Sequence, residues 1–311
     1  MENILIKNSN INTASNGNKY LNMNIVFNNE EYNAKYWDYL RLNKDVKQVL
    51  KKDLPAVFSV DLEENYFNDN KQYIIKKFYK YSNDFDMIKE YYRKADVNLD
   101  LIKTYLKDKI KFIKKELNLD LTDIILNDKF LNYPAARNIH NAYMHGLVEH
   151  TYHMLVFADK LLYSNTNQKD FSLETYLQDD EFLNKPLVFA GILLHDVAKI
   201  FEYEEKSAKF GIGVDTNKAK LLGHIYNGAE LVNSLDCDEN IKIKLKHIIL
   251  SHHKRKDWGS PIEPKTPEAW FVHLMDYMDA KMEIIREAKD KYKNGWTSKI
   301  TGLNNNKLFL N

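Results

Sequence analysis

The chain has 311 residues, which is long enough for two domains whose hydrophobic cores need no cross-link for stability. Lysine and arginine number 45 against 44 acidic residues, so the net charge of +1 excludes a global electrostatic drive toward nucleic acid and leaves such binding to local patches. The single cysteine, Cys237, excludes an internal disulfide and fits a reducing cytoplasm. No apolar run approaches the roughly 20 residues that span a bilayer, so we expect a soluble, cytoplasmic protein without membrane contact.

The N-terminal part, residues 1–83, has the pattern of strands. KYLNMNIVF, NN and EYNAKYWDY predict one hairpin, and ENYF, NDN and KQYIIKKFYKY predict a second. Four or five short strands favour a small OB-type barrel. Its aromatic side chains belong either to the core or to a platform on which bases stack, with Trp37 as a candidate substrate contact. The aromatic set includes Tyr36, Trp37, Tyr66, Phe67 and Tyr73.

After residue 83 the apolar spacing changes to three and four, which is typical of helices. We predict a helical connector over 84–125 and an all-α bundle with a C-terminal tail over 126–311. The fold class is therefore α+β, in more than one domain. The lysines between 107 and 115 indicate either a contact to a polyanion or a solvated helix face.

Potential metal ligands stand on separate predicted helices. His150 lies in line with the apolar stripe of Leu147 and Met154, and the pair His195 and Asp196 ends the almost wholly apolar run of NKPLVFAGILLHDVAKI. An imidazole beside a carboxylate in a buried helix carries a large desolvation cost, which a metal ion compensates directly. Because Asp196 has two oxygens, it can bridge two ions.

Later helices add further candidates. His224 stands near a helix start, His252 and His253 stand at a helix end, and Asp276 lies on an inward helix face with Asp279 as the runner-up. Taken singly, a histidine of this kind is more often a core residue and such an aspartate a surface residue. Together they predict one or two divalent ions within a helical bundle.

The segment that follows this histidine pair contains three candidate substrate contacts, Lys254, Arg255 and Trp258. Lys254 and Arg255 either complement the end of the helix or attract phosphate beside a metal centre. Trp258 either stacks on a terminal base or anchors a loop.

With this order of histidines and aspartates, the chain resembles the HD-domain phosphohydrolases. It resembles more closely the HD-domain 3′-to-5′ exoribonucleases of the YhaM type, which join an N-terminal OB-fold to an HD domain. The specific matches are PAARNIHNAYMHGLVEHT, GILLHDVAKI, KLLGHI, HIILSHHKRKDWGSPIEPKTPEA and LMDYMDAKM. Weaker matches are KYLNMNI and AKYWD in the barrel and GWTSKITGL in the tail.

The resemblance implies a role for each of these residues. Asp196 would be shared by two metals and would be catalytic together with Lys199, which is expected on the same helix face as His195 and in contact with the scissile phosphate. Ala198 stands where the family commonly has glycine. Its additional methyl group near the centre affects the expected fit of the substrate. The implied ligands are His150, His195, Asp196 and Asp276 for one metal, and Asp196, His224, His252 and His253 for the second.

The implied function is a metal-dependent 3′-to-5′ exoribonuclease that hydrolyses single-stranded RNA, or DNA, to 5′-mononucleotides through a metal-activated hydroxide. Two ions per chain are expected, with manganese ahead of cobalt, iron or magnesium. Activity should fall below about pH 6 as the imidazoles protonate. The alternatives are an HD phosphohydrolase of free nucleotides (a deoxynucleoside triphosphate, a cyclic nucleotide or an alarmone) and a binding module with a structural metal. A homo-oligomer is compatible with the tail.

Overall fold

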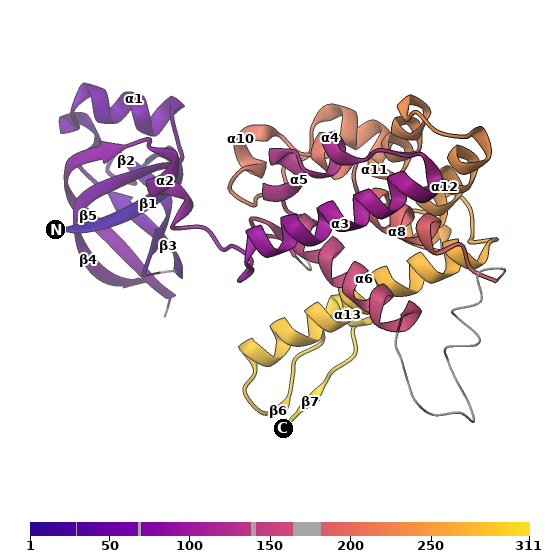
Figure 1. The fold of residues 1–311 in the computed structure, drawn as a ribbon. Coiled ribbons are helices and arrows are strands. Elements are labelled where there is room, and N and C mark those ends of the chain that lie inside the picture. Colours follow the sequence, from indigo (N-terminus) through magenta and orange to yellow (C-terminus); the bar gives the residue numbers. More distant parts are fainter. Residues whose placement is uncertain (29, 68–69, 138–140, 164–181) are drawn as a thin grey trace. The chain divides into compact units, whose positions relative to one another are not determined.

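The computed structural model describes residues 1–28, 30–67, 70–137, 141–163 and 182–311. It divides the chain into two compact units, Met1–Arg93 and Lys94–Asn311 (Figure 1). Parts of the predicted hairpin turns, at 29 and 68–69, and residues 138–140 of the motif PAARNIHNAYMHG lie outside the described residues.

The N-terminal unit is built on a closed five-stranded barrel with the strand order β1-β2-β3-β5-β4. β3 and β5 pair in parallel and the other neighbours are antiparallel. The two predicted hairpins are the pairs β2–β3 and β4–β5, so the OB-like barrel is confirmed. The strands are β1 (Glu2–Thr13), β2 (Lys19–Phe27), β3 (Glu30–Tyr36), β4 (Ala56–Phe67) and β5 (Asn70–Ser82).

A helix interrupts the predicted run of strands. α1 (Lys44–Lys52) begins at Asn43, whose side chain accepts a hydrogen bond from the backbone of Asp45. Its apolar residues Val46 and Val49 are buried and belong to the barrel core. The expectation of strands throughout this region was wrong here, although the capping asparagine and the apolar spacing of three were signals for a helix. A second helix of this unit, α2 (Phe85–Lys89), follows β5.

The second unit is helical, as predicted, and α8 (Lys185–Leu194) lies at its centre. Every residue of α8 from Leu187 to Leu194 is buried, and α8 contacts α3, α6, α12 and α13. α3 (Leu99–Leu117) contributes Ile102 and Leu106 to the same core, so the part of the predicted connector from residue 94 onward belongs to this unit, whereas residues 84–93 belong to the N-terminal unit. The other α-helices among the described residues of this unit are α4 (Thr122–Ile125), α5 (Asp128–Asn132), α6 (Gly146–Leu162), α9 (Lys199–Glu202), α10 (Glu205–Ala208), α11 (Asn217–Leu231), α12 (Glu239–Ser251) and α13 (Pro267–Lys291).

The tail after α13 forms a hairpin. Its strands, β6 (Gly295–Trp296) and β7 (Phe309–Leu310), pair in antiparallel fashion, and the short helix η4 (Thr301–Leu303) between them contacts α13 (Figure 1). Within the described ranges, no helix has the length and apolar character needed to cross a membrane.

Candidate metal centre

The two carboxylate oxygens of Asp196 face two groups of histidines. Oδ2 lies 3.5 Å from Nε2 of His195 and 3.9 Å from Nε2 of His150. Oδ1 lies 3.4 Å from Nε2 of His224 and 3.7 Å from Nε2 of His252. One carboxylate therefore joins both groups, as a bridging ligand does. The donors that converge within 4.8 Å of one another are His150, His195 and Asp196 in one group and His224, His252 and His253 in the other.

Three buried polar atoms of this cluster lack a hydrogen-bond partner among the described residues. They are Oδ1 of Asp196, Nε2 of His224 and Nε2 of His252. An unsatisfied buried polar atom costs about 1–3 kcal/mol, so three that face one another are a costly arrangement unless a cation lies between them. The donor set fits a divalent metal ion for this reason.

A close pair of imidazole nitrogens marks the other group. Nε2 of His150 lies 3.2 Å from Nε2 of His195. Two nitrogen ligands, each about 2.0–2.1 Å from one ion, can adopt this spacing. Asp276 closes the group, because its Oδ1 lies 3.4 Å from Nε2 of His150.

The far nitrogen of each imidazole is held by an acceptor. Nδ1 of His195 lies 2.8 Å from the carbonyl of Ile192, and Nδ1 of His252 lies 2.7 Å from the carbonyl of Ile249. Because a carbonyl only accepts, Nδ1 carries the proton and Nε2 keeps its lone pair for the cluster. The corresponding acceptors are the Trp258 carbonyl for His253, at 2.8 Å, and the Glu202 carboxylate for His224, at 3.3 Å.

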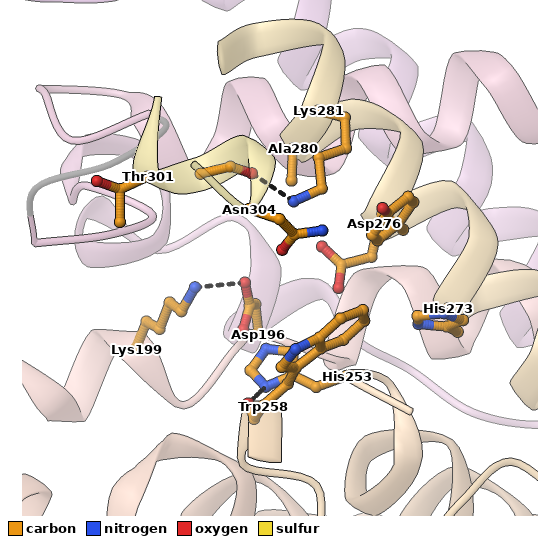
Figure 2. Close-up of a pocket in the computed structure, with 12 residues that line it drawn as sticks. Asp196, Lys199, His253, Trp258, His273, Asp276, Ala280, Lys281, Thr301 and Asn304 are labelled. Carbon is orange, nitrogen blue, oxygen red and sulfur yellow. Dashed lines mark hydrogen bonds and ion pairs between the residues drawn. The ribbon is translucent and has the colours of Figure 1, made fainter. Parts of the chain in front are cut away.

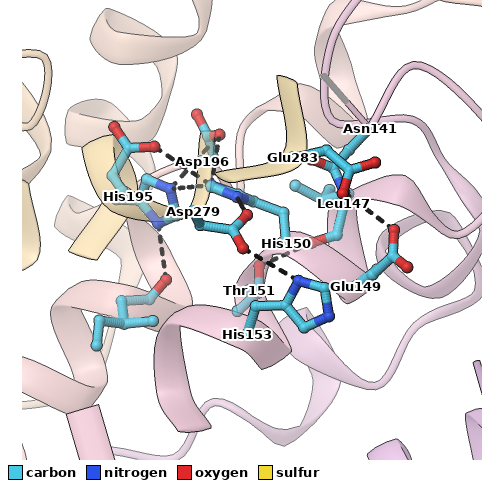
Figure 3. Close-up of polar contacts among 12 residues, drawn as sticks. Asn141, Leu147, Glu149, His150, Thr151, His153, His195, Asp196, Asp279 and Glu283 are labelled. Atoms are coloured by element: carbon cyan, nitrogen blue, oxygen red, sulfur yellow. Dashed lines mark hydrogen bonds and ion pairs between the residues drawn. The ribbon is translucent and has the colours of Figure 1, made fainter. Parts of the chain in front are cut away.

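Asp279 has this supporting role for His150. Its Oδ2 accepts from Nδ1 of His150 at 2.6 Å, and its Oδ1 lies 3.0 Å from Nδ1 of His153 (Figure 3). The runner-up for the ligand position therefore binds the outer side of the imidazole, whereas Asp276 faces the inner side. A carboxylate in this position fixes the ring orientation and raises the basicity of the ligand.

The backbone at the histidine–aspartate pair is tighter than predicted. α8 ends at Leu194, and the next residues form turns in which the amide of Val197 donates to Leu194 and that of Lys199 to Asp196. The prediction that His195 and Lys199 share one helix face was wrong. The turn instead brings Nζ of Lys199 to 2.6 Å from Oδ2 of Asp196 (Figure 2).

A kink in α11 aims His224 at the cluster. Gly223 has a φ of 71°, a left-handed value inside the helix, and His224 follows it directly. Glycine adopts this conformation without the strain that a Cβ would add. The predicted helix start after Gly223 corresponds to this break.

Burial and charge give the site an affinity for cations. Burial lowers the pKa of His195 and, together with His253, holds the pKa of His252 well below its usual range, so both imidazoles are neutral near pH 7. Burial alone would raise the pKa of Asp196, but Lys199 and the surrounding imidazoles keep it well below the usual range. At His150, burial is outweighed by hydrogen bonds to Asp276 and Asp279, which raise its pKa to about 10. Metals bind neutral imidazoles and ionised carboxylates, so His195, His252 and Asp196 are already in the ligand form, whereas His150 would release a proton when a cation binds.

A pocket of about 400 Å³ opens onto this cluster (Figure 2). Five of its lining residues were predicted from the sequence as site residues: Asp196, Lys199, His253, Trp258 and Asp276. The opposite wall, which comes from α13 and the tail, was not predicted, although the tail match GWTSKITGL was a signal for it. This wall includes Tyr277, Lys281, Thr301, Gly302 and Asn304.

The candidate substrate contacts after His253 differ in position. Trp258 lines the pocket and stacks on Tyr277, with ring centroids 6.0 Å apart and planes at 12°. Arg255 lies over the Trp258 ring at 5.4 Å and pairs with Asp257 at 3.0 Å, and Lys254 lies over Trp270. Neither Lys254 nor Arg255 lines the described pocket.

The barrel aromatics separate into core and surface. Tyr36 and Tyr73 are buried and belong to the barrel core. Trp37 is 47% exposed, and Phe67 is 58% exposed and lines a separate pocket of about 430 Å³. Nζ of Lys35 lies 5.7 Å from the Trp37 ring and 5.0 Å from the Phe67 ring, so a half-buried lysine places its positive charge near two exposed rings.

Comparison with known proteins agrees with this architecture. The sequence model of the HD domain matches residues 147–281, which contain the whole histidine and aspartate cluster. This part of the chain is therefore similar to HD domains, which bind divalent metals, and the cluster is a possible site for such an ion.

The similarity to particular relatives extends into the barrel. The chain is 28% identical to the 3′-5′ exoribonuclease YhaM of Oceanobacillus iheyensis over 98% of this chain and 92% of that one. It is 29% identical to YhaM of Listeria innocua over 98% and 93% of the two chains. YhaM of a Geobacillus species is 34% identical over 58% and 52%. The resemblance predicted from the motifs is confirmed, and no solved structure matches the chain.

Replacing Asp279 by asparagine should weaken the site without destroying it. The amide cannot accept hydrogen bonds from both His150 and His153 as the carboxylate does, so His150 becomes less well oriented. Loss of such a supporting carboxylate typically costs about 10–100-fold in metal affinity or activity. The expected result is a titration curve for manganese-dependent activity that shifts by this factor toward higher metal concentration. An unchanged curve would contradict the supporting role.

Proposed function

We propose that this protein is a metal-dependent exoribonuclease that shortens single-stranded RNA from the 3′ end and releases 5′-mononucleotides. One observation carries the proposal: the two oxygens of Asp196 are divided between two histidine groups, at the wall of a pocket that also contains a buried lysine. The full-length similarity to proteins named 3′-5′ exoribonuclease supports the substrate and the direction of attack.

Two divalent ions would be held at this site, with manganese as the first candidate because imidazole ligands do not favour magnesium. When bound, such a pair supplies a nucleophilic water of lowered pKa and positive charge for the phosphate oxygens. The proposed ligands are His150, His195, Asp196 and Asp276 for one ion, and Asp196, His224, His252 and His253 for the other.

The remaining residues of the pocket would position the strand. Lys199 is buried against Asp196; burial alone would lower its pKa, but the carboxylate raises it, so the ammonium stays charged. It would contact the scissile phosphate. That charge would stabilise the negative charge that develops on the phosphate oxygens. Trp258 presents an indole ring at the pocket, on which a base can stack.

The barrel would retain the strand upstream of the cleaved end. Its exposed rings at Trp37 and Phe67, with Lys35 between them, combine stacking with positive charge as single-strand binding surfaces do. Next to them, the pocket at Phe67 is lined by polar side chains of β2, β3 and β5.

Replacing Phe67 by alanine should raise KM for a long RNA by roughly 5- to 100-fold, because base stacking on an aromatic ring contributes about 1–3 kcal/mol. Hydrolysis of a dinucleotide, which offers the barrel no further nucleotides to bind, should change little. Tyr79→Ala is the matched control, since Tyr79 is also an exposed barrel aromatic but does not line this pocket. Equal effects of both variants on long RNA would contradict a specific role for Phe67.

The decisive experiment is incubation of the purified protein with manganese and 5′-end-labelled single strands of RNA and DNA. Progressive shortening from the 3′ end, with 5′-mononucleotides as the other product, is the expected result. Cleavage of deoxynucleoside triphosphates or cyclic nucleotides, with the labelled strands left intact, would overturn the proposal in favour of a free-nucleotide phosphohydrolase.

A further inference from the structure

The tip of the tail hairpin forms part of the pocket wall and is held in place by hydrogen bonds. Ile300 pairs with Asn306 across the loop, and Thr297 pairs with Leu308 through the hydrogen bond from its amide to the Leu308 carbonyl. Nζ of Lys281 on α13 donates to the carbonyl of Gly302 at 2.6 Å, which ties the tip to the helix that carries Asp276. Residues distant in sequence are thus fixed opposite the metal ligands.

Two polar side chains at this tip are available to a ligand. Thr301 and Asn304 line the pocket, and Figure 2 shows the Asn304 amide pointing toward Asp276. Among the residues with described positions, none makes a side-chain hydrogen bond with Asn304 or with the Thr301 hydroxyl. Asn304 has a φ of 55°, a left-handed conformation that asparagine adopts more readily than most residues.

We propose that Asn304, with Thr301, binds the 2′- and 3′-hydroxyl groups of the terminal ribose and makes the enzyme select a 3′-terminal ribonucleotide. An amide and a hydroxyl each offer a donor and an acceptor, which matches the two neighbouring hydroxyls of ribose. The inference rests on the proposed function, in which the terminal nucleotide lies between the metal ligands and the tail. A volume of about 400 Å³ is near the lower end for small-ligand pockets and suits one nucleotide.

This arrangement also explains how the two sugars would be distinguished. The 2′-hydroxyl is the group by which a protein recognises RNA rather than DNA at a given position. A site built to bind a hydroxyl rejects a substrate that lacks it, because its own polar group is left without a partner. We therefore expect the enzyme to distinguish ribose from deoxyribose at the terminal nucleotide alone, while the barrel accepts both RNA and DNA.

The test uses two oligoribonucleotides that differ only in the last sugar, one with ribose and one with 2′-deoxyribose. The full-length protein with manganese should prefer the ribose end, and Asn304→Gly should reduce that preference by roughly 3- to 10-fold, as expected for loss of one or two hydrogen bonds. Glycine keeps the left-handed backbone accessible. The matched control is Asn305→Gly, because Asn305 also has a positive φ but does not line the pocket.

A binding measurement separates recognition from catalysis. In the Asp196→Asn background, where no cleavage is expected, fluorescence anisotropy should show tighter binding of the ribose-ended strand, and Asn304→Gly should remove most of this difference. Equal binding of the two ends, or an undiminished preference after Asn304→Gly, would overturn the inference while leaving the exoribonuclease intact. If the unmodified enzyme shortens neither oligonucleotide, the proposed function fails and the inference fails with it.

Discussion

Asp196→Asn is expected to reduce RNA hydrolysis by at least about 1,000-fold, equivalent to about 4 kcal/mol of transition-state stabilisation. The two oxygens of Asp196 face different histidine groups, and an amide offers one oxygen and an NH₂ group in their place. The NH₂ group cannot coordinate a cation, so the bridge between the two groups is lost. Initial rates with a labelled RNA in saturating manganese measure the effect.

The control for this variant is Asp215→Asn. Asp215 is also buried in the helical unit, where it pairs with Arg137 at 2.7 Å, but it does not line the pocket. Its loss should leave the rate per folded molecule within about 3-fold of the original, as expected for a change that touches no reacting group. Circular dichroism should show both variants folded. Full hydrolysis by Asp196→Asn would refute the assignment of this residue to the metals.

Removal of divalent metal should abolish hydrolysis, and manganese should restore it. The buried donors of Asp196, His224 and His252 that lack hydrogen-bond partners become satisfied when a cation binds, so metal should also stabilise the fold. At a concentration of about 100 times Kd the gain is about 2.7 kcal/mol, which corresponds to an increase of about 5–10 °C in Tm for a unit of this size.

This prediction is checked by thermal unfolding of chelator-treated protein with and without manganese, in parallel with RNA hydrolysis. Asp196→Asn should lose most of the shift in Tm, whereas Asp215→Asn should keep it. A Tm that does not respond to any divalent ion, together with full hydrolysis in excess chelator, would exclude the metal centre.

The local elements of this fold could be predicted because apolar residues repeat every two residues in a half-buried strand and every three to four residues in a helix. Alternation in KYLNMNIVF predicted β2, and the apolar run before His195 predicted the buried α8. The helix α1 was missed because its short amphipathic segment stands between strands, and its cap at Asn43 was the stronger signal.

The same patterns did not decide which aromatic side chains of the barrel lie in the core and which lie on the surface. Tyr36 is the last residue of β3 and Trp37 follows it directly, yet Tyr36 is buried and Trp37 is exposed. Which side becomes the interior depends on how the barrel closes, and closure is set by strand pairing over long separations. Only the structure places Tyr36 in the core and leaves Trp37 exposed.

By itself the sequence determined the chemistry of the candidate centre: the histidines and aspartates, their order and their places near helix ends or on inward faces. Only the tertiary structure decided which of these side chains face the cluster and which support another ligand. Asp276 and Asp279 are three residues apart on one helix, and packing of α13 against α6 turns the first toward the cluster and the second toward the outer nitrogen of His150. The pocket wall at Asn304 likewise exists only because the tail returns to α13, a contact between distant segments that no local periodicity encodes.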